Sequence, residues 1–550
     1  MTTVAAAVGE AVALLGARHV FTLLGSGNFV VTGGLRDAGA IVVALRHETA
    51  VVTAADAYAR VTGELGIVTL HQGPGLTNAL TGIAEAAKSR TPLLVLAADT
   101  AGAAVRSNFR IDQAGVVAAV GAGVERLHGP GSAVADVARA YRRAVAERRP
   151  VVLMMPLDVQ AADCPDTAVP PAPAPGVAPV RPSDGAVGAL ADLLGQASRP
   201  VVLAGRGATL SGAGGLLEQL AERTGALVAT SAVAAGLFGG NRWDLGISGG
   251  FASPRAAELV ADADLVLAFG ASLTMWTTRH GRLLGPGATV VQIDTDTDAL
   301  GANHPVDLAV LGDAAETARD LLAELDRRDH QAAGQRTPAL ADRIAAGRWR
   351  DEPHDDVTAD GQVDPRSLTK ALEALLPGER TLVVDSGHFM GWAPMYLTVP
   401  RGAGFVFTQG FQSVGLGLAT AVGAALAIPD RLTVVAIGDG GALMTLGELE
   451  SIARLRLRMV VVVYDDGAYG AEVHHFGPGG HPVDLVQFPE VDFAGTARAL
   501  GFRATQVRRV EDLAALTDWL EEGDPAPLLL DAKVVPTVVA DWLEEAFRGH

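Results

Sequence analysis

The segment 432–467, LTVVAIGDGGALMTLGELESIARLRLRMVVVVYDDG, decides the predicted fold because its pattern is that of two strands joined by a helix. Leu432–Ile437 and Met459–Tyr464 are apolar runs rich in β-branched residues, and the stretch between them has helical periodicity. Thr445 and Glu448 fit a capping box, so we expect the helix to open there after a glycine-bearing turn. In a right-handed βαβ unit, both strands end at the same edge of one sheet.

A carboxylate follows each of these strands: Asp439, within Gly438-Asp439-Gly440, and Asp466. Open α/β sheets bind ligands at the carboxyl ends of their strands, so both carboxylates are expected to face one point. Magnesium prefers one or two carboxylates with phosphate oxygens, and Gly440 and Gly441 let backbone N–H groups approach a phosphate closely. The pattern predicts a magnesium and phosphate site, although a turn aspartate beside an unrelated loop carboxylate would give the same letters.

The same alternation of strands and helices extends along the whole chain. It predicts an α/β protein of three consecutive domains with mainly parallel sheets. Helices are expected near Thr49–Arg60, Leu76–Lys88 and Gly215–Thr224. The other expected strands are Ile41–Leu45, Leu65–Leu70, Pro92–Ala97, Pro200–Ala204, Leu265–Phe269, Ala288–Ile293, Thr381–Asp385 and Pro527–Asp531.

Two stretches of the chain are predicted to be linkers. Residues 164–182 are too rich in proline for a helix interior or a central strand. Residues 329–364 are polar and charged, with some helical character. These stretches divide the chain into predicted domains at 1–163, 183–328 and 365–550, each of ordinary domain size.

The composition is that of a folded protein without an affinity for polyanions. Of 550 residues, 49% are hydrophobic and 19% charged, which excludes intrinsic disorder. The formal charge of −19 disfavours nucleic acid or an anionic membrane as a partner. One cysteine, Cys164, can form neither an internal disulfide nor a cysteine-based zinc site. No signal peptide or membrane-spanning segment is recognised, so a cytoplasmic location is expected.

At this point the sequence resembles a known family. Gly438-Asp439-Gly440 and the loop around Asp466 are similar to the cofactor motif of the thiamine diphosphate superfamily that includes acetolactate synthase, pyruvate decarboxylase and benzaldehyde lyase. Three further stretches carry the same resemblance: RHETAVVTAADAYAR (46–60), HQGPGLTNALTGIAEAAKSRTPLLVLAAD (71–99) and GFQSVGLGLATAVGAALA (410–427). The resemblance covers nearly the whole chain. It implies a pyrimidine-binding domain, a central nucleotide-like domain and a diphosphate-binding domain, in that order.

The resemblance also implies which residues hold the cofactor. Asp439, Asp466 and the backbone carbonyl of Ala468 would ligate Mg2+. Glu48 would hydrogen-bond the pyrimidine N1′ and promote the imino tautomer that removes the thiazolium C2 proton. Val414 would keep the cofactor bent, and the carbonyl of Gln412 would accept a hydrogen bond from its 4′-amino group. The other expected cofactor contacts are Gly73, Pro74, Ser386, Gly387, His388, Gly438, Gly440, Gly441, Tyr469 and Gly470.

One departure from the family concerns the metal loop, where Asp465-Asp466 stands in place of the usual Asn-Asn. Aspartate supplies the same oxygen ligand as asparagine but adds a negative charge near a diphosphate. An adjacent Mg2+ can absorb that charge, whereas without metal the two carboxylates repel each other. We therefore expect binding of the cofactor to depend tightly on Mg2+.

The residues expected on the substrate side are less specific. Any of them could instead satisfy backbone groups of its loop. Two features of the acetolactate synthase pocket are missing: Asp112 replaces a phenylalanine, and residues 114–127 lack the expected lysine. Valine–isoleucine pathway synthesis from pyruvate is therefore not expected. The catalytic candidates besides Glu48 are Asn28, His71, Gln113, Glu472, His474 and His475.

These features together predict a thiamine diphosphate- and Mg2+-dependent lyase or carboligase, a decarboxylase or transferase acting on a 2-keto acid or an acyloin. Two alternatives stay open: an FAD-dependent 2-keto acid oxidase, with Asp294 near the nucleotide, and a non-catalytic relative with an altered metal loop. An NAD dehydrogenase is disfavoured because no dinucleotide fingerprint follows a predicted strand. The resemblance brings Glu48 of one chain over Asp439 of another, so a homodimer or homotetramer is expected.

Overall fold

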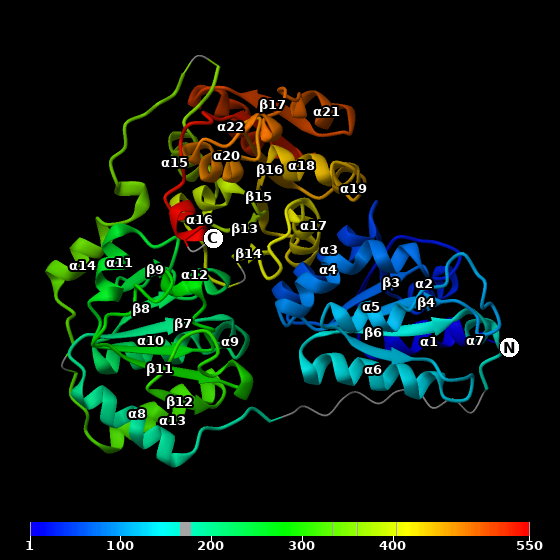
Figure 1. Ribbon diagram of the computed structural model, residues 1–550, viewed down its shortest axis with the longest axis horizontal. Coiled ribbons are helices and arrows are strands. Elements are labelled where there is room, and N and C mark those ends of the chain that lie inside the picture. The colour runs from blue at the N-terminus through cyan, green and yellow to red at the C-terminus, as the bar shows by residue number, and fades with distance from the viewer. Residues whose placement is uncertain (1, 166–177, 333, 360, 403, 549–550) are drawn as a thin grey trace.

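The computed structural model describes residues 2–165, 178–332, 334–359, 361–402 and 404–548. It contains three six-stranded parallel sheets interleaved with helices, which confirms the predicted fold class (Figure 1). Much of the proline-rich linker, residues 166–177, lies outside the described residues, as do residues 333 and 360 of the second linker. The exact domain boundaries stay predictions.

The first sheet has the strand order β2-β1-β3-β4-β6-β5, in which all neighbours are parallel. Its strands are β1 (His19–Thr22), β2 (Ile41–Ala44), β3 (Gly66–Leu70), β4 (Leu93–Asp99), β5 (Gly123–Arg126) and β6 (Pro150–Pro156). The helices of this region are α1 (Val4–Leu14), α2 (Phe29–Asp37), α3 (Glu48–Thr62), α4 (Pro74–Lys88), α5 (Gln113–Ala119), α6 (Ala133–Glu147) and α7 (Leu157–Ala161).

The second sheet has the order β12-β11-β10-β7-β8-β9, which is the doubly wound order of nucleotide-binding folds. Its strands are β7 (Pro200–Ala204), β8 (Leu227–Thr230), β9 (Asp244–Ile247), β10 (Leu265–Phe269), β11 (Thr289–Asp294) and β12 (Leu308–Leu311). The helices are α8 (Asp184–Gln196), α9 (Arg206–Leu210), α10 (Gly214–Thr224), α11 (Pro254–Ala261), α12 (Met275–Thr278) and α13 (Ala314–Arg327), followed by α14 (Pro338–Ala345).

The third sheet, β14-β13-β15-β16-β18-β17, repeats the strand order of the first. Its strands are β13 (Arg380–Val384), β14 (Phe405–Phe407), β15 (Leu432–Gly438), β16 (Met459–Asp465), β17 (Arg503–Val507) and β18 (Leu528–Lys533). The helices are α15 (Pro365–Leu375), α16 (Trp392–Tyr396), α17 (Gly417–Ala427), α18 (Asp439–Met444), α19 (Glu448–Arg454), α20 (Gly470–Phe476), α21 (Phe493–Ala499), α22 (Ala514–Glu522) and α23 (Trp542–Ala546).

The connection between β15 and β16 differs from the prediction. The expected glycine-bearing turn is the helix α18, which begins directly after the extended Gly438. Thr445 does not cap α19; its hydroxyl donates to the carbonyl of Gly441, one turn back in α18. The expected capping box is therefore wrong, because Thr445 ends one short helix instead of opening the next.

The first and third sheets are joined by a shared apolar core. Helix α3 packs along α17, and Figure 1 shows the two side by side between the sheets. Residues of both helices, such as Val51 and Val422, belong to one buried cluster. At the closest approach, a Cβ added to Gly423 of α17 would stand 2.0 Å from the carbonyl oxygen of Ala54. Only glycine therefore fits at this crossing.

No helix in the described part of the chain combines the length and the apolar character that crossing a bilayer requires.

We predict that Gly423→Ala lowers the free energy of unfolding by about 1–3 kcal/mol, because the added methyl overpacks the crossing of α3 and α17. Thermal or denaturant unfolding measures this change. Gly215→Ala in α10 is the matched control: no atom lies within 4 Å of the added Cβ, so the substitution is neutral or stabilises by up to about 1 kcal/mol. Equal stability of both variants would contradict the packing argument.

Candidate functional site

The two predicted metal carboxylates lie together at the edge of the third sheet. β15 and β16 are neighbours, with Gly438 opposite Tyr464, so Asp439 and Asp466 leave the sheet at the same edge. Burial and then the charges of Asp466 and Asp465 raise the pKa of Asp439 to about 8. Burial likewise raises the pKa of Asp466 to about 7. Two carboxylates that repel each other in a poorly solvated volume form a place where a cation is stabilised.

The surroundings of these carboxylates fit a magnesium ion with a diphosphate. A Cβ on Gly440 would stand 2.7 Å from the Tyr469 ring, and one on Gly470 would stand 2.4 Å from the Asp466 carboxylate. These glycines let the Tyr469 ring and the Asp466 carboxylate lie close against the backbone at this edge. No group of three or more His, Cys, Asp or Glu side chains in the described residues could hold a metal. A cation here would need additional oxygens, such as the Ala468 carbonyl and phosphate.

His388 lies against the same loop in a defined tautomer. Its Nε2 accepts a hydrogen bond of 2.9 Å from the backbone N–H of Ala540, so the proton of the neutral ring is on Nδ1. Nδ1 lies 3.3 Å from the position of a Cβ on Gly470, beside the Asp466 carboxylate. Burial, and the neighbouring His474, lower the pKa of His388 to about 3. His388 is therefore a neutral N–H donor beside the predicted diphosphate position.

The loop 410–416, expected to grip the pyrimidine, is held by two buried carboxylates. Asp385 accepts hydrogen bonds from the backbone N–H groups of Gly415 and Leu416, both at 3.0 Å at the closest oxygen. Glu85 of α4 accepts those of Gly410 and Phe411, at 3.0 and 2.6 Å. Between these anchors, Gln412 has a φ of 59°, in the left-handed region that a non-glycine residue rarely adopts. The chain thus holds the Gln412 carbonyl in a strained, fixed orientation.

Three other predicted cofactor contacts lie in the third region of the chain, as does the loop 410–416. The Val414 side chain is 39% exposed, so a ligand or a partner chain can contact it. Gly387 has a φ of 141°, which opens the turn before His388. The hydroxyl of Ser386 donates to Gln409, at 3.2 Å.

The first domain supplies a second cluster around Glu48, the first residue of α3. One carboxylate oxygen of Glu48 accepts a hydrogen bond of 3.1 Å from the side-chain amide of Asn78, and the other lies 3.7 Å from a Cβ placed on Gly75. His71 lies beside it: Nδ1 accepts from the N–H of Gly27 at 3.1 Å, so Nε2 carries the proton. Burial lowers the pKa of His71, although Glu48 opposes the change. Glu48 and a neutral His71 therefore share one surface.

Two of the predicted catalytic residues face inward. Asn28 is fully buried, and its amide N–H groups donate to Thr22, to Thr69 and to the carbonyl of Leu23. The Gln113 side chain accepts from the N–H of Gly73 at 2.8 Å and donates to the carbonyl of Ala98 at 3.0 Å. From the sequence, both residues are expected on the substrate side. In the structure both side chains are buried and form hydrogen bonds that hold turns.

Gln113 explains the geometry at Gly73 and Pro74. Gly73 has a φ of 63°, and Pro74 opens α4 immediately after it. The Gln113 hydrogen bond fixes this left-handed turn, so its role is to position the turn.

Helix α20 carries the other three candidates. Glu472 is half-buried in its first turn. The His474 ring lies 4.5 Å from that of His388, and its Nε2 is buried with no hydrogen-bond partner in the described residues. His475 stacks on Phe547, with centroids 4.0 Å apart. His474 therefore joins the diphosphate side, whereas His475 packs against the C-terminal segment.

One chain does not bring the two clusters together. Glu48 lies beside Gly75 and Asn78 near the start of α4, whereas the loop at Gly410 is bound by Glu85 near its end. A helix rises 1.5 Å per residue, so α4 separates these positions by about 10–15 Å. Glu48 and the loop that carries Gln412 therefore lie toward opposite ends of α4 within one chain.

A cavity of about 970 Å³ is lined by residues of all three regions, including Arg90 of the first. Arg206, Trp276 and Asp294 line it from the central region and Gln412 from the third. Burial lowers the pKa of Arg206 to about 10, yet the group stays cationic at neutral pH. The cavity is large enough for a nucleotide and holds a cation for its phosphates.

Four residues that hold the site were missed by the sequence analysis: Asp385, Asn78, Glu85 and Lys533. Asp385 ends a predicted strand at the ligand-binding edge, which is a signal that was available. Asn78 and Glu85 lie within a stretch that resembles the family, but their partners are distant in sequence.

Comparison with known proteins agrees with this geometry. Residues 2–116 match the thiamine pyrophosphate enzyme, N-terminal TPP binding domain; residues 187–321 match its central domain, and residues 385–532 match its C-terminal TPP binding domain. The chain therefore belongs to the thiamine pyrophosphate enzyme family. It is an enzyme whose domains bind thiamine diphosphate, and the resemblance seen in the sequence is confirmed.

Three similar proteins indicate the branch of the family. The acetolactate synthase large subunit of Parasynechococcus marenigrum is 31% identical over 90% of this chain and 80% of its own length. The sulfoacetaldehyde acetyltransferase of Castellaniella defragrans is 28% identical over 90% and 87%, respectively. A probable 2-ketoarginine decarboxylase of Pseudomonas aeruginosa is 30% identical over 92% and 89%.

We predict that Asp466→Ala weakens binding of Mg2+ and of thiamine diphosphate by roughly tenfold or more, or about 1.4 kcal/mol, because one oxygen ligand is lost. Calorimetric titration of each ligand measures this loss. Asp518→Ala, an exposed aspartate in the same region of the chain, is the control and leaves both affinities unchanged. Unaltered binding by Asp466→Ala would remove this residue from the metal site.

Proposed function

We propose that this enzyme is a thiamine diphosphate- and Mg2+-dependent lyase or carboligase acting on a 2-keto acid or an acyloin. The observation that carries the proposal is the pair of buried carboxylates, Asp439 and Asp466, at one edge of the third sheet. The similar proteins support the substrate class, since their names include an acetolactate synthase, an acetyltransferase and a keto acid decarboxylase. The particular acyl donor and acceptor are open to screening by product mass.

In this proposal the cofactor, when bound, would supply a nucleophilic carbon and an electron sink for cleavage of the bond next to the substrate carbonyl. The residues of the chain hold and activate it. Asp439, Asp466 and the Ala468 carbonyl hold Mg2+ at the diphosphate, and His388 donates its Nδ1 proton there. The Gln412 carbonyl and Val414 orient the pyrimidine.

The proton transfers fall to residues on both sides of the cleft. Glu48, which accepts a hydrogen bond from Asn78, would hold the proton that is shared with the pyrimidine N1′. His71 presents its Nε2–H on the same surface and would orient the carbonyl oxygen of the substrate. Glu472 and His474 of α20 would serve protonation of the product.

We further propose that the active site forms between two chains. Glu48 and Gln412 must contact the same pyrimidine ring, yet α4 holds them apart within one chain. Apolar side chains on both surfaces are exposed, including Phe29 at 63% near the Glu48 cluster and Met444 at 56% beside the loop 410–416. A second copy would cover these side chains and complete two sites by symmetry.

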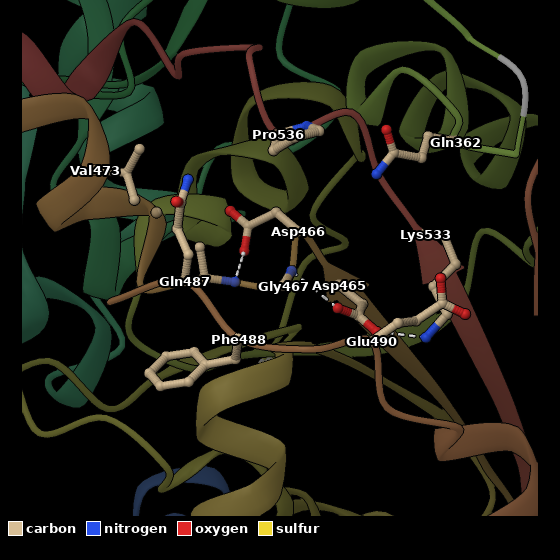
Figure 2. Close-up of a pocket in the computed structure, with 12 residues that line it drawn as sticks. Gln362, Asp465, Asp466, Gly467, Val473, Gln487, Phe488, Glu490, Lys533 and Pro536 are labelled. Carbon is tan, nitrogen blue, oxygen red and sulfur yellow. Dashed lines mark hydrogen bonds and ion pairs between the residues drawn. The ribbon is translucent and has the colours of Figure 1, made fainter. Parts of the chain in front are cut away.

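The flavin-dependent oxidase is the second candidate. The cavity with Arg206 and Asp294 favours it, because its size and its cation suit a dinucleotide. A flavin absorption spectrum in the purified protein would support this candidate. The non-catalytic alternative has no support from the metal loop, where Asp465 is ion-paired and directed away from Asp466 (Figure 2).

We predict that Glu48→Ala slows exchange of the C2 proton of bound thiamine diphosphate by roughly a hundredfold or more, while cofactor affinity changes little. Loss of the acid–base group removes activation of the cofactor but leaves the diphosphate site intact. Quenched-flow hydrogen exchange followed by NMR measures the rate. Glu10→Ala, an exposed residue of α1, is the control. Normal exchange in Glu48→Ala would refute the assigned role.

We predict that mixing two inactive variants, Glu48→Ala and Asp466→Ala, restores about a quarter of the wild-type activity after subunit exchange. Half of the dimers then contain both variants, and each of these has one intact site of two. A coupled assay with the identified substrate measures the recovery, and light scattering checks the assembly. If the site formed within one chain, mixing would restore nothing.

A further inference from the structure

The extra carboxylate of the metal loop, Asp465, has a buried partner. Asp465 is the last residue of β16 and lies opposite Lys533, the last residue of β18. The Lys533 ammonium lies 2.5 Å from Asp465, 2.9 Å from Asp531 and 2.6 Å from the carbonyl oxygen of Val491. The side chains of Asp465 and Lys533 are only 4% and 3% exposed. The ammonium therefore donates hydrogen bonds to Asp465 and to Val491, and forms an ion pair with Asp531 as well.

This ion pair is part of the loop that carries Asp466. The other oxygen of Asp465 accepts a hydrogen bond of 3.0 Å from the N–H of Gly467. Figure 2 shows Asp465 and Lys533 on one side of a cavity of about 270 Å³, with the Asp466 carboxylate directed away from them. The pair thus fixes the backbone between Asp465 and Ala468 and keeps the Asp465 carboxylate out of the metal position.

The charge of Asp465 reaches both metal carboxylates. Asp465 directly precedes Asp466, and the strand that it ends, β16, pairs with β15, which ends just before Asp439. An unpaired negative charge at this distance attracts a divalent cation and repels a diphosphate, and the low solvation of the site makes both effects large. Lys533 offsets that charge at its source.

We propose that Lys533 is a positioning residue of the cofactor site, which withdraws Asp465 from the metal and cancels its charge. The site then offers two carboxylates to Mg2+ and does not repel the diphosphate, despite the Asp465-Asp466 pair. The inference rests on the proposed function, because it takes Asp439 and Asp466 as the metal ligands. It accounts for how the cofactor site tolerates the negative charge of aspartate at position 465.

The test uses three variants of the full-length protein: Asp465→Asn, Lys533→Met and the double variant. Calorimetry measures Mg2+ binding to the protein without cofactor, and thiamine diphosphate binding at saturating Mg2+. Asp465→Asn removes one negative charge, so the net charge around Asp439 and Asp466 becomes more positive by one. Mg2+ binding therefore weakens and thiamine diphosphate binding strengthens, each by roughly threefold to tenfold. Lys533→Met changes both affinities in the opposite directions. The double variant restores the net charge and both affinities.

The opposite signs separate this role from a merely structural one. If each single variant weakens both ligands, the pair only supports the loop and the proposal is wrong. If Asp465→Asn abolishes Mg2+ binding and the double variant does not recover it, Asp465 is itself a metal ligand and the proposal is again wrong. Should Lys533→Met fail to fold, Asp465→Asn and the double variant decide the outcome. A wild-type protein that binds neither ligand would refute the proposed function instead.

Discussion

The close packing of α3 against α17 fixes where the two halves of the cofactor site lie. The crossing at Gly423 and Ala54 joins the first and third sheets of one chain into a common core. It directs the start of α3, with Glu48, away from the loop at Gln412. The proposed two-chain site depends on this arrangement, because the two halves of the site lie apart within one chain.

A second constraint is electrostatic. The edge of the third sheet gathers three aspartates at positions 439, 465 and 466 in a poorly solvated volume. Such a cluster is unfavourable unless cations compensate it. Lys533 offsets one carboxylate within the protein, and in our proposal a metal ion would compensate the other two. This division would make the altered loop compatible with a bound diphosphate.

The sequence predicted the fold well because parallel strands between helices have a strong periodic pattern. The convergence of Asp439 and Asp466 was also predictable, since neighbouring parallel strands end at one edge. The inward direction of the Asn28 and Gln113 side chains was not predictable, because it depends on tertiary hydrogen bonds to turns that are distant in sequence. The Lys533 pairing depends on β18 lying beside β16, an order that local pattern does not contain.

The first and third sheets share one strand order, although they perform different tasks. In our proposal each holds one end of the same cofactor through the loops at its carboxyl edge, while the strands themselves stay in the core. Loops at such an edge can vary without disturbing the scaffold. With this repeated arrangement, the loops that contact the substrate could change while the loops that hold the cofactor stay the same.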